Sequence, residues 1–257
     1  MAEETVKLET EQKVTFDPQL PTKRLPVVSF SPKRTLIYSI PKGGKTTIVA
    51  GLDECLLIDL EEGSEAVEAM RIQAKNVNEL RAICNKIQIT GTKYKYIALD
   101  TVTALEAMCI PLAGKIYKAT PQGKNFDTTK NVLHLPDGAG YTYLREAFEM
   151  MLKMLQECCE RLILLGHVKD KFLAKAGAEV VSKDIDLTGK LKNITCANAD
   201  AIGYLYRKGK DTVLTFITTD DVICGARPAH LRNQEFVVAT EQPDKSIKVD
   251  WSKIFID

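Results

Sequence analysis

The stretch SIPKGGKTT, Ser39–Thr47, stands between an apolar segment at 35–39, TLIYS, and a segment of helical character at 44–52, GKTTIVAGL. A glycine-rich turn between a buried strand and a helix is the setting of a phosphate-binding loop, because backbone N–H groups and the positive helix end converge on the phosphates. The alternative is a strand-to-helix turn with a surface lysine. We predict a nucleotide-binding loop, whose contacts are Ser39, Pro41, Lys42, Gly43, Gly44, Lys45, Thr46 and Thr47.

Two side chains of this loop have distinct predicted roles. Lys45 reaches the β- and γ-phosphates, and the hydroxyl of Thr46 binds Mg²⁺. The first position of the motif, where glycine is expected, holds Ser39. This departure implies either that the serine tolerates the loop geometry or that the loop is slightly reshaped.

Apolar strands alternate with amphipathic helices along the chain. Further buried strands are predicted at 55–60, 94–100 and 161–168, and helices at 78–88, 102–113 and 144–155. Two apolar runs joined by KGKD, at 201–207 and 212–218, are typical of a closing β-hairpin. The segments 114–140 and 169–198 lack periodicity and are predicted to be irregular. This order predicts an α/β fold with a mostly parallel twisted sheet, helices on both faces and a C-terminal β-hairpin.

Acidic residues end two of the predicted strands. Asp100 follows an apolar run and can hold Mg²⁺ opposite Thr46. Glu61, with Asp59 as the second choice, can orient and polarise the water that attacks the γ-phosphate. The alternatives are a strand-end aspartate that starts a turn and a solvated acidic turn.

A histidine ends the fourth strand. His167 follows Gly166 at the end of the apolar run 161–168. Because parallel strands share one carboxyl edge, we expect His167 to point into the same crevice and to contact the γ-phosphate. The alternative is a histidine of the core or of the surface.

The composition is that of a globular protein. The 257 residues are 45% hydrophobic and 27% charged, with a net charge of +1. This balance neither indicates nor excludes a nucleic-acid partner, so a DNA surface has to be a local patch. We expect a flexible, proline-containing arm at 1–29, followed by one domain at 30–257.

Several features indicate a cytoplasmic protein. The acidic start predicts no secretory signal, and the longest apolar runs are too short to cross a bilayer. Seven cysteines without a C-x-x-C pair predict reduced core residues rather than disulfides or a zinc site.

Six segments together resemble the phage nucleotide-binding proteins, which are compact RecA-like ATPases, some of which act with single-strand annealing and recombination. The segments are IPKGGKTT, LLIDLEEG, YIALDTVT, LLGHVKD, DIDLTGKL and DWSKIF, and the resemblance covers about residues 30–257. It implies a RecA-like core that binds the cofactors ATP and Mg²⁺ at the strand ends. If the protein is encoded by a phage, the compartment is the cytoplasm of the bacterial host.

The resemblance also implies roles for individual residues. Glu61 matches the water-activating glutamate, His167 the γ-phosphate sensor, and Arg227 an arginine that crosses a subunit interface. Many relatives have a lysine two residues before that arginine, and this chain has Gly225 there, so it departs from the paired lysine–arginine pattern. With Lys45, these residues form the predicted catalytic set. The implied partners are single-stranded DNA, further copies of the chain and a phage single-strand-binding protein.

Lysines outnumber acidic residues in both irregular segments, which match the DNA-facing loops of the superfamily. Aromatic side chains among them can stack on bases. The alternative is a pair of solvated loops. The predicted DNA contacts are Lys124, Lys171, Lys175 and Lys183, with Tyr117, Phe126 and Phe172 as candidate stacking residues.

We therefore expect an ATPase that is stimulated by single-stranded DNA and acts in recombination or annealing. Three alternatives stay open. One is a RecA-related ring motor, such as a helicase core or a clock-type ATPase. Another is a small-molecule kinase, which the scatter of only nine arginines disfavours, since kinases usually have an arginine-rich lid. The third is an ATP-binding interaction module without useful hydrolysis.

Overall fold

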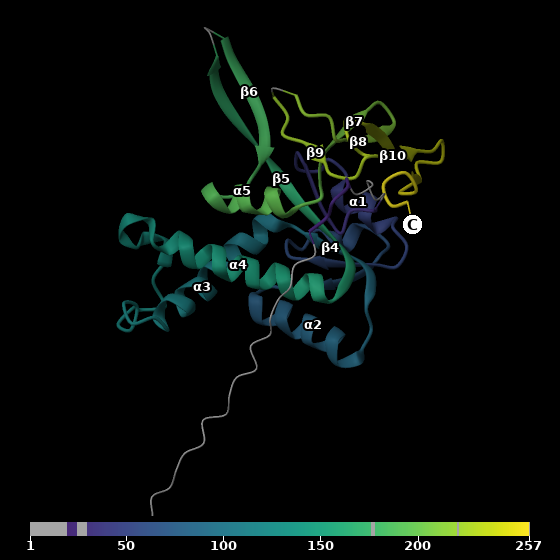
Figure 1. The fold of residues 1–257 in the computed structure, drawn as a ribbon. Coiled ribbons are helices and arrows are strands. Elements are labelled where there is room, and N and C mark those ends of the chain that lie inside the picture. Colours follow the sequence, from purple (N-terminus) through teal and green to yellow (C-terminus); the bar gives the residue numbers. More distant parts are fainter. Residues whose placement is uncertain (1–19, 25–29, 176–177, 220, 257) are drawn as a thin grey trace, which may run out of the picture.

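The fold is organised around one large β-sheet, seen in a computed structural model that describes residues 20–24, 30–175, 178–219 and 221–256, with the side chains of 170–181 left out (Figure 1). Its eleven strands include a path in the order β11–β10–β8–β7–β1–β5–β4–β2–β3. The strands from β7 to β3 pair in parallel, and β8, β10 and β11 add antiparallel strands at one edge.

The strands of the sheet have the following bounds. They are β1 Arg34–Ser39, β2 Cys55–Asp59, β3 Met70–Gln73, β4 Tyr94–Asp100, β5 Cys159–Lys175, β6 Ala178–Ile185, β7 Ala201–Lys208, β8 Asp211–Thr215, β9 Gly225–Ala226, β10 Glu235–Glu241 and β11 Ile247–Val249. Between β1, which leads into the glycine-rich loop, and β4, which ends at Asp100, lies β5. This order and the β7–β8 hairpin confirm the predicted α/β fold with a mostly parallel sheet and a C-terminal β-hairpin.

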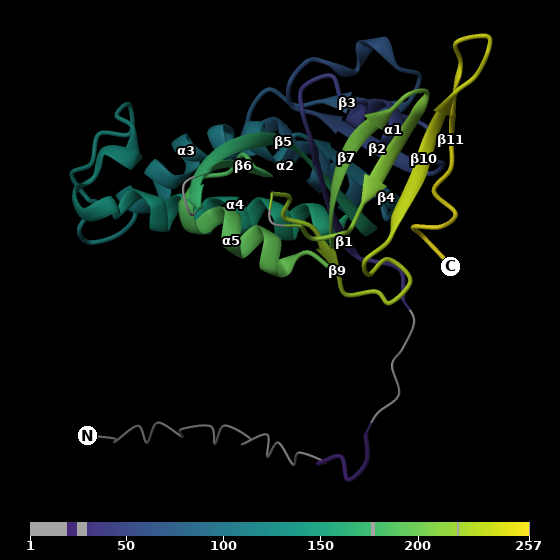
Figure 2. The same ribbon diagram turned by 90° about the horizontal axis from the view of Figure 1, so that it is seen from above.

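Helices cover both faces of the sheet. On one face pack α2 Val77–Thr90, α3 Val102–Lys118, α4 Gly140–Glu157 and α5 Gly189–Asn198, and Figures 1 and 2 show α3 and α4 side by side. On the other face, α1 Lys45–Ala50 packs with the C-terminal segment. Two cores result because alternate side chains of each strand point to opposite faces: Leu36 and Tyr38 face the first, and Ile37 faces the second.

Local sequence explains where the helices begin and end. Asn76 caps α2 by accepting hydrogen bonds from Asn78 N and Glu79 N, and Gly91 ends that helix with a left-handed φ of 67°. Thr101 caps α3 through a hydrogen bond from Ala104 N. The helix α3 continues to Lys118, beyond the predicted end near 113, because Gly114 is a packing position against Phe126 rather than a stop.

The predicted irregularity of 169–198 is wrong. Strand β5 continues through Lys175 and pairs antiparallel with β6, from Val168 opposite Ile185 to Lys175 opposite Ala178, and α5 follows. Figure 1 shows this β5–β6 hairpin projecting from the body of the protein. Strands that pair mainly with each other do not need the apolar periodicity of a buried sheet, so the pattern search missed them. The exposed strand β3 and the strands β10 and β11 beyond the β7–β8 hairpin were also not predicted.

Other expectations fall partly outside the described structure. Most of the predicted arm at 1–29 lies outside the described residues. All seven cysteines are free, and six are buried, in agreement with their predicted place in the core. Within the ranges that the structure describes, no helix is both long enough and apolar enough to span a bilayer.

The C-terminal segment docks onto the helix of the glycine-rich loop. The indole N–H of Trp251 donates a hydrogen bond of 2.8 Å to Ile48 O, and the indole stacks on Phe255. Trp251 is 6% exposed, so the bond is shielded from water. The segment therefore fixes the position of α1.

Replacing Trp251 by phenylalanine is expected to lower the free energy of unfolding by about 1–3 kcal/mol, because it leaves Ile48 O without its donor. Urea denaturation measures the change. The matched control is Tyr206→Phe, which removes an exposed hydrogen bond to Glu235 and is expected to cost under about 0.5 kcal/mol. Equal stability of Trp251→Phe and the parent would contradict the docking role.

Candidate nucleotide-binding site

The glycine-rich loop joins the carboxyl end of β1 to α1 and can be formed only with small residues at two positions. A Cβ atom on Gly43 would lie 2.6 Å from Ser39 Oγ and 3.0 Å from Ile40 O, which excludes a side chain there. Gly44 caps α1 with a left-handed φ of 97°, a conformation that favours glycine. No side chain therefore covers the loop backbone at these two positions, as a phosphate-binding loop requires.

Lys45 lies across the loop with its side chain buried. Its Nζ is 3.1 Å from Ser39 Oγ, 3.3 Å from Ile40 O and 3.4 Å from Ser39 O. Burial lowers the pKa of Lys45, and the nearby carboxylates of Asp100 and Glu61 oppose that shift. Ser39 is fully buried, and its hydroxyl donates to Ile40 O, so serine serves at this position as a partner of the lysine. The ammonium group is thus placed for an anion.

Thr46 and Asp100 come together from two different elements. The hydroxyl of Thr46 donates a hydrogen bond of 2.6 Å to Asp100 Oδ2. Asp100 is 7% exposed, and this burial raises its pKa, against the opposing effects of Thr46 and Lys45.

This oxygen pair fits Mg²⁺. Within the described ranges, no group of three histidine, cysteine, aspartate or glutamate residues could hold a metal ion. Magnesium in nucleotide sites is held by one or two protein oxygens together with phosphates and water, so a larger cluster is not required.

Glu61, His167 and Thr101 form a second group beside the loop. His167 Nε2 lies 3.0 Å from Glu61 Oε2 and 3.1 Å from Oε1, and the Thr101 hydroxyl donates to Glu61 Oε1 at 2.6 Å. The register of the parallel strands explains the meeting, since Asp59 pairs with Asp100 and Asp100 with Leu165, so that β2 and β5 end at the same edge of the sheet. The carboxylate and the imidazole are therefore held as one unit.

Asp59, the second choice for water activation, has a different task. It is 3% exposed, and its two oxygens accept hydrogen bonds of 2.8 Å from Glu61 N and Ser64 N. Burial alone would raise its pKa, but these hydrogen bonds outweigh burial and lower it. Asp59 therefore fixes the turn that presents Glu61, which favours Glu61 as the group that faces the water.

A cleft of about 360 Å³ joins these groups, and its lining includes an arginine that the sequence analysis missed. Arg207, near the end of β7, lines it together with the loop, Glu61, Asp100 and His167. A sequence signal existed, because Arg207 stands at the end of the apolar run 201–207. Strand β7 pairs in parallel with β1 and so ends at the same edge of the sheet as the glycine-rich loop. Arg207 was not predicted as a site residue because the β7–β8 hairpin was expected only to close the sheet.

Arg227 lies elsewhere in the chain. Its guanidinium is 3.4 Å from Asp200 Oδ1 and donates to Ala197 O at 2.5 Å. Asp200 precedes β7 and also accepts hydrogen bonds from Lys33 N and Arg34 N, at the amino ends of the strands. The structure therefore does not bring Arg227 to the loop of its own chain, and its role across an interface stays a prediction.

The predicted DNA contacts are spread over two segments. Lys124 is exposed after α3, whereas Lys183 lies over the Tyr204 ring at 5.2 Å. Lys171 and Lys175 occupy backbone positions on the β5–β6 hairpin, but their side chains, like that of Phe172, lie outside the description. Two other candidate stacking residues, Tyr117 and Phe126, are half-buried and pack on each other at 5.2 Å, and Tyr117 also packs on Tyr143; their contact with bases stays a prediction.

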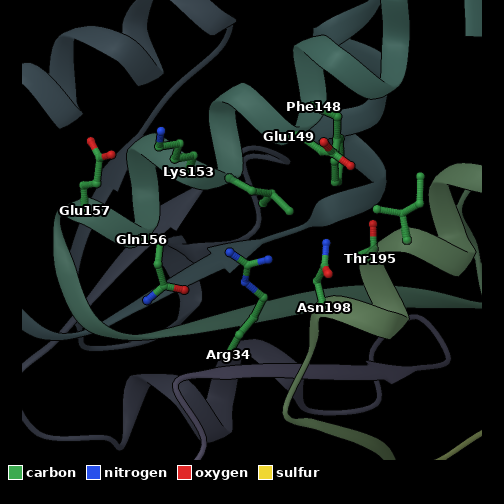
Figure 3. A pocket seen from close by; sticks show the side chains of 10 residues that line it. Arg34, Phe148, Glu149, Lys153, Gln156, Glu157, Thr195 and Asn198 are labelled. Atoms are coloured by element: carbon green, nitrogen blue, oxygen red, sulfur yellow. The ribbon is translucent and has the colours of Figure 1, made fainter. Parts of the chain in front are cut away.

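A larger cavity, of about 440 Å³, lies at the amino end of β1 (Figure 3). Its lining comes from α4 and α5, and Arg34 of β1 points into it. It contains none of the loop residues that can bind phosphates, so size alone does not identify the functional site.

The chain matches a family model over most of its length and is similar to solved structures. A family model described as an AAA domain matches residues 31–245. The chain is similar to the crystal structure of the RadB recombinase, with 11% identity, a TM-score of 0.46 and coverage of 86% of this chain and 92% of that one. It is also similar to a KaiC-like protein from the archaeon Pyrococcus horikoshii, with 14% identity, a TM-score of 0.44 and coverage of 85% and 89%. No curated protein matches the chain.

Proposed function

The chain belongs to the family of AAA domains, and from this premise we propose that it is a RecA-like ATPase that acts on single-stranded DNA in phage-type recombination or strand annealing. Its proposed partners are single-stranded DNA, further copies of itself and a phage single-strand-binding protein. Its proposed place of action is the cytoplasm.

The residues of the cleft support ATP hydrolysis. Lys45 and the loop N–H groups bind the phosphates, and Thr46 and Asp100 would hold Mg²⁺. When bound, Mg²⁺ supplies positive charge that neutralises the phosphate oxygens. Glu61 orients a water molecule and accepts its proton as the water oxygen bonds to the γ-phosphorus and the bond to the β–γ bridging oxygen breaks.

One observation carries the proposed link to DNA. Strand β5 bears His167 at its junction with the loop and continues directly into the projecting β5–β6 hairpin (Figure 1). The hairpin bears Lys171, Lys175 and Lys183 along its two strands. A γ-phosphate that competes with Glu61 for His167 would act on the base of this hairpin, which is a switch of the kind that phosphate contacts operate in other nucleotide-binding proteins.

The rate of ATP hydrolysis with and without single-stranded DNA tests the proposed function. We expect a DNA-stimulated rate, with the Lys45→Ala variant giving the background.

Replacing Lys171 and Lys175 together by alanine is expected to weaken DNA binding and to flatten its salt dependence by about 0.7 in log–log slope for each lost phosphate contact. The matched control is the double replacement of Lys245 and Lys248, which are exposed near the far edge of the sheet. An unchanged slope would contradict the hairpin as the DNA surface, and a rate that DNA does not change would contradict the proposed DNA dependence.

A further inference from the structure

Arg207 stands on the side of the glycine-rich loop opposite the acidic residues. Strand β1, which leads into the loop, is flanked by β5 on one side and by β7 on the other. His167 comes from β5, and Asp100 from β4 beyond it, whereas Arg207 comes from β7. The cleft is thus bounded by groups from both sides of β1.

The guanidinium of Arg207 lies close to the loop backbone. Its Nη2 is 3.8 Å from the point where a Cβ atom on Gly44 would stand, next to the methyl group of Thr212. Arg207 pairs through its backbone with Thr212 of β8, so the β7–β8 hairpin holds its position. The guanidinium therefore lies within van der Waals reach of the loop at position 44, where glycine is favoured by its positive φ of 97°.

Arg207 has no partner of opposite charge among the residues that the structure describes. Other arginines near the surface are engaged: Arg227 pairs with Asp200, and Arg145 donates to Thr142. In the cleft, the three carboxylates already have partners, since Asp59 accepts backbone N–H groups, Glu61 contacts His167, and Asp100 accepts from Thr46. A guanidinium beside a phosphate-binding backbone, with no carboxylate of its own, is suited to planar, paired hydrogen bonds with phosphate oxygens.

We propose that Arg207 binds the α- and β-phosphates of the nucleotide in its own subunit. This inference rests on the proposed nucleotide binding and adds a residue to it. The end of the cleft with Glu61 and His167 receives the γ-phosphate, so the arginine on the other side of the loop faces the phosphates that stay on ADP. Arg207 therefore holds ATP and ADP equally, and it needs no neighbouring subunit to do so.

Calorimetric titration of ATP and ADP into the full chain and its Arg207→Ala variant tests this role. We expect both affinities to fall by a similar factor, about 10- to 100-fold for a lost charged hydrogen bond. Arg207→Lys is expected to recover part of the affinity. The matched control is Lys208→Ala, which removes the adjacent exposed cation on the same strand without touching the cleft and is expected to leave both affinities unchanged.

Several outcomes separate this proposal from its rivals. A loss confined to ATP would overturn it in favour of a γ-phosphate contact, and unchanged affinities would remove Arg207 from the site. An equal mixture of Lys45→Ala and Arg207→Ala chains is expected to contain no tight sites, and recovery of tight sites would instead establish action between subunits. A parent chain that binds neither nucleotide would overturn the proposed function itself, which is a different result from equal binding by parent and variant.

Discussion

Replacing Glu61 by glutamine is expected to lower the rate of ATP hydrolysis by about 10²–10⁴-fold while leaving ATP affinity nearly unchanged. The amide keeps the shape of the carboxylate and can still meet His167 and Thr101, which contact Glu61 at 3.0–3.1 Å and 2.6 Å. It cannot accept the proton of the attacking water. Steady-state hydrolysis and calorimetric binding of ATP together measure the two effects.

The matched variant is Asp59→Asn, because both oxygens of Asp59 already accept backbone hydrogen bonds, from Glu61 N and Ser64 N. An asparagine keeps one accepting oxygen, so it is expected to cost stability and to slow hydrolysis less than Glu61→Gln does. The assignment would be off by two residues if Asp59→Asn stopped hydrolysis and Glu61→Gln did not. Loss of ATP binding in Glu61→Gln would indicate a structural role instead.

The nucleotide cleft was largely predictable because its parts follow local rules. A buried strand, a turn with two glycines and a short helix occur within residues 34–50, so geometry and sequence coincide there. The meeting of His167 with Glu61 follows from a rule about sheets, since residues at the ends of parallel strands share an edge. The register of Ser39 with His167 and of Asp59 with Asp100 expresses that rule in the structure.

Other features depend on partners that no local pattern reveals. Strand β5 runs past His167 because β6 supplies its hydrogen bonds, and the hairpin sequence lacks the regular alternation of apolar and polar residues that marks a half-buried strand. Gly114 resembles a helix stop in sequence, yet it is a contact point for Phe126 within α3. Arg207 lies near the carboxyl end of β7 and Arg227 beside its amino end, and this placement depends on the pairing of β7 with β1 and β9, which the sequence does not show.

Replacing Asp100 by asparagine is expected to have opposite effects on activity and on stability. Hydrolysis that depends on Mg²⁺ should fall by at least about a hundredfold, because a neutral amide is a poor ligand for a hard cation. The metal-free protein should become more stable at neutral pH. The amide still accepts the hydrogen bond of Thr46, which is 2.6 Å long in the parent, so the turn between β4 and α3 keeps its contact with the loop.

The sign of the stability change follows from the pKa of Asp100, which burial raises above its ordinary value. A carboxyl group with a raised pKa in the folded state costs stability wherever it is ionised, so stability falls as the pH rises through the interval between its unfolded and folded pKa values. Asparagine removes this cost at neutral pH. The difference in the free energy of unfolding between variant and parent should therefore narrow as the pH falls toward about 3.9, the ordinary pKa of aspartate. Urea denaturation in the presence of a chelator, at neutral and at mildly acidic pH, measures both points. A variant that is less stable than the parent at neutral pH would contradict this prediction. It would mean that the attraction between the Asp100 carboxylate and the Lys45 ammonium stabilises the fold by more than the burial of the carboxylate destabilises it.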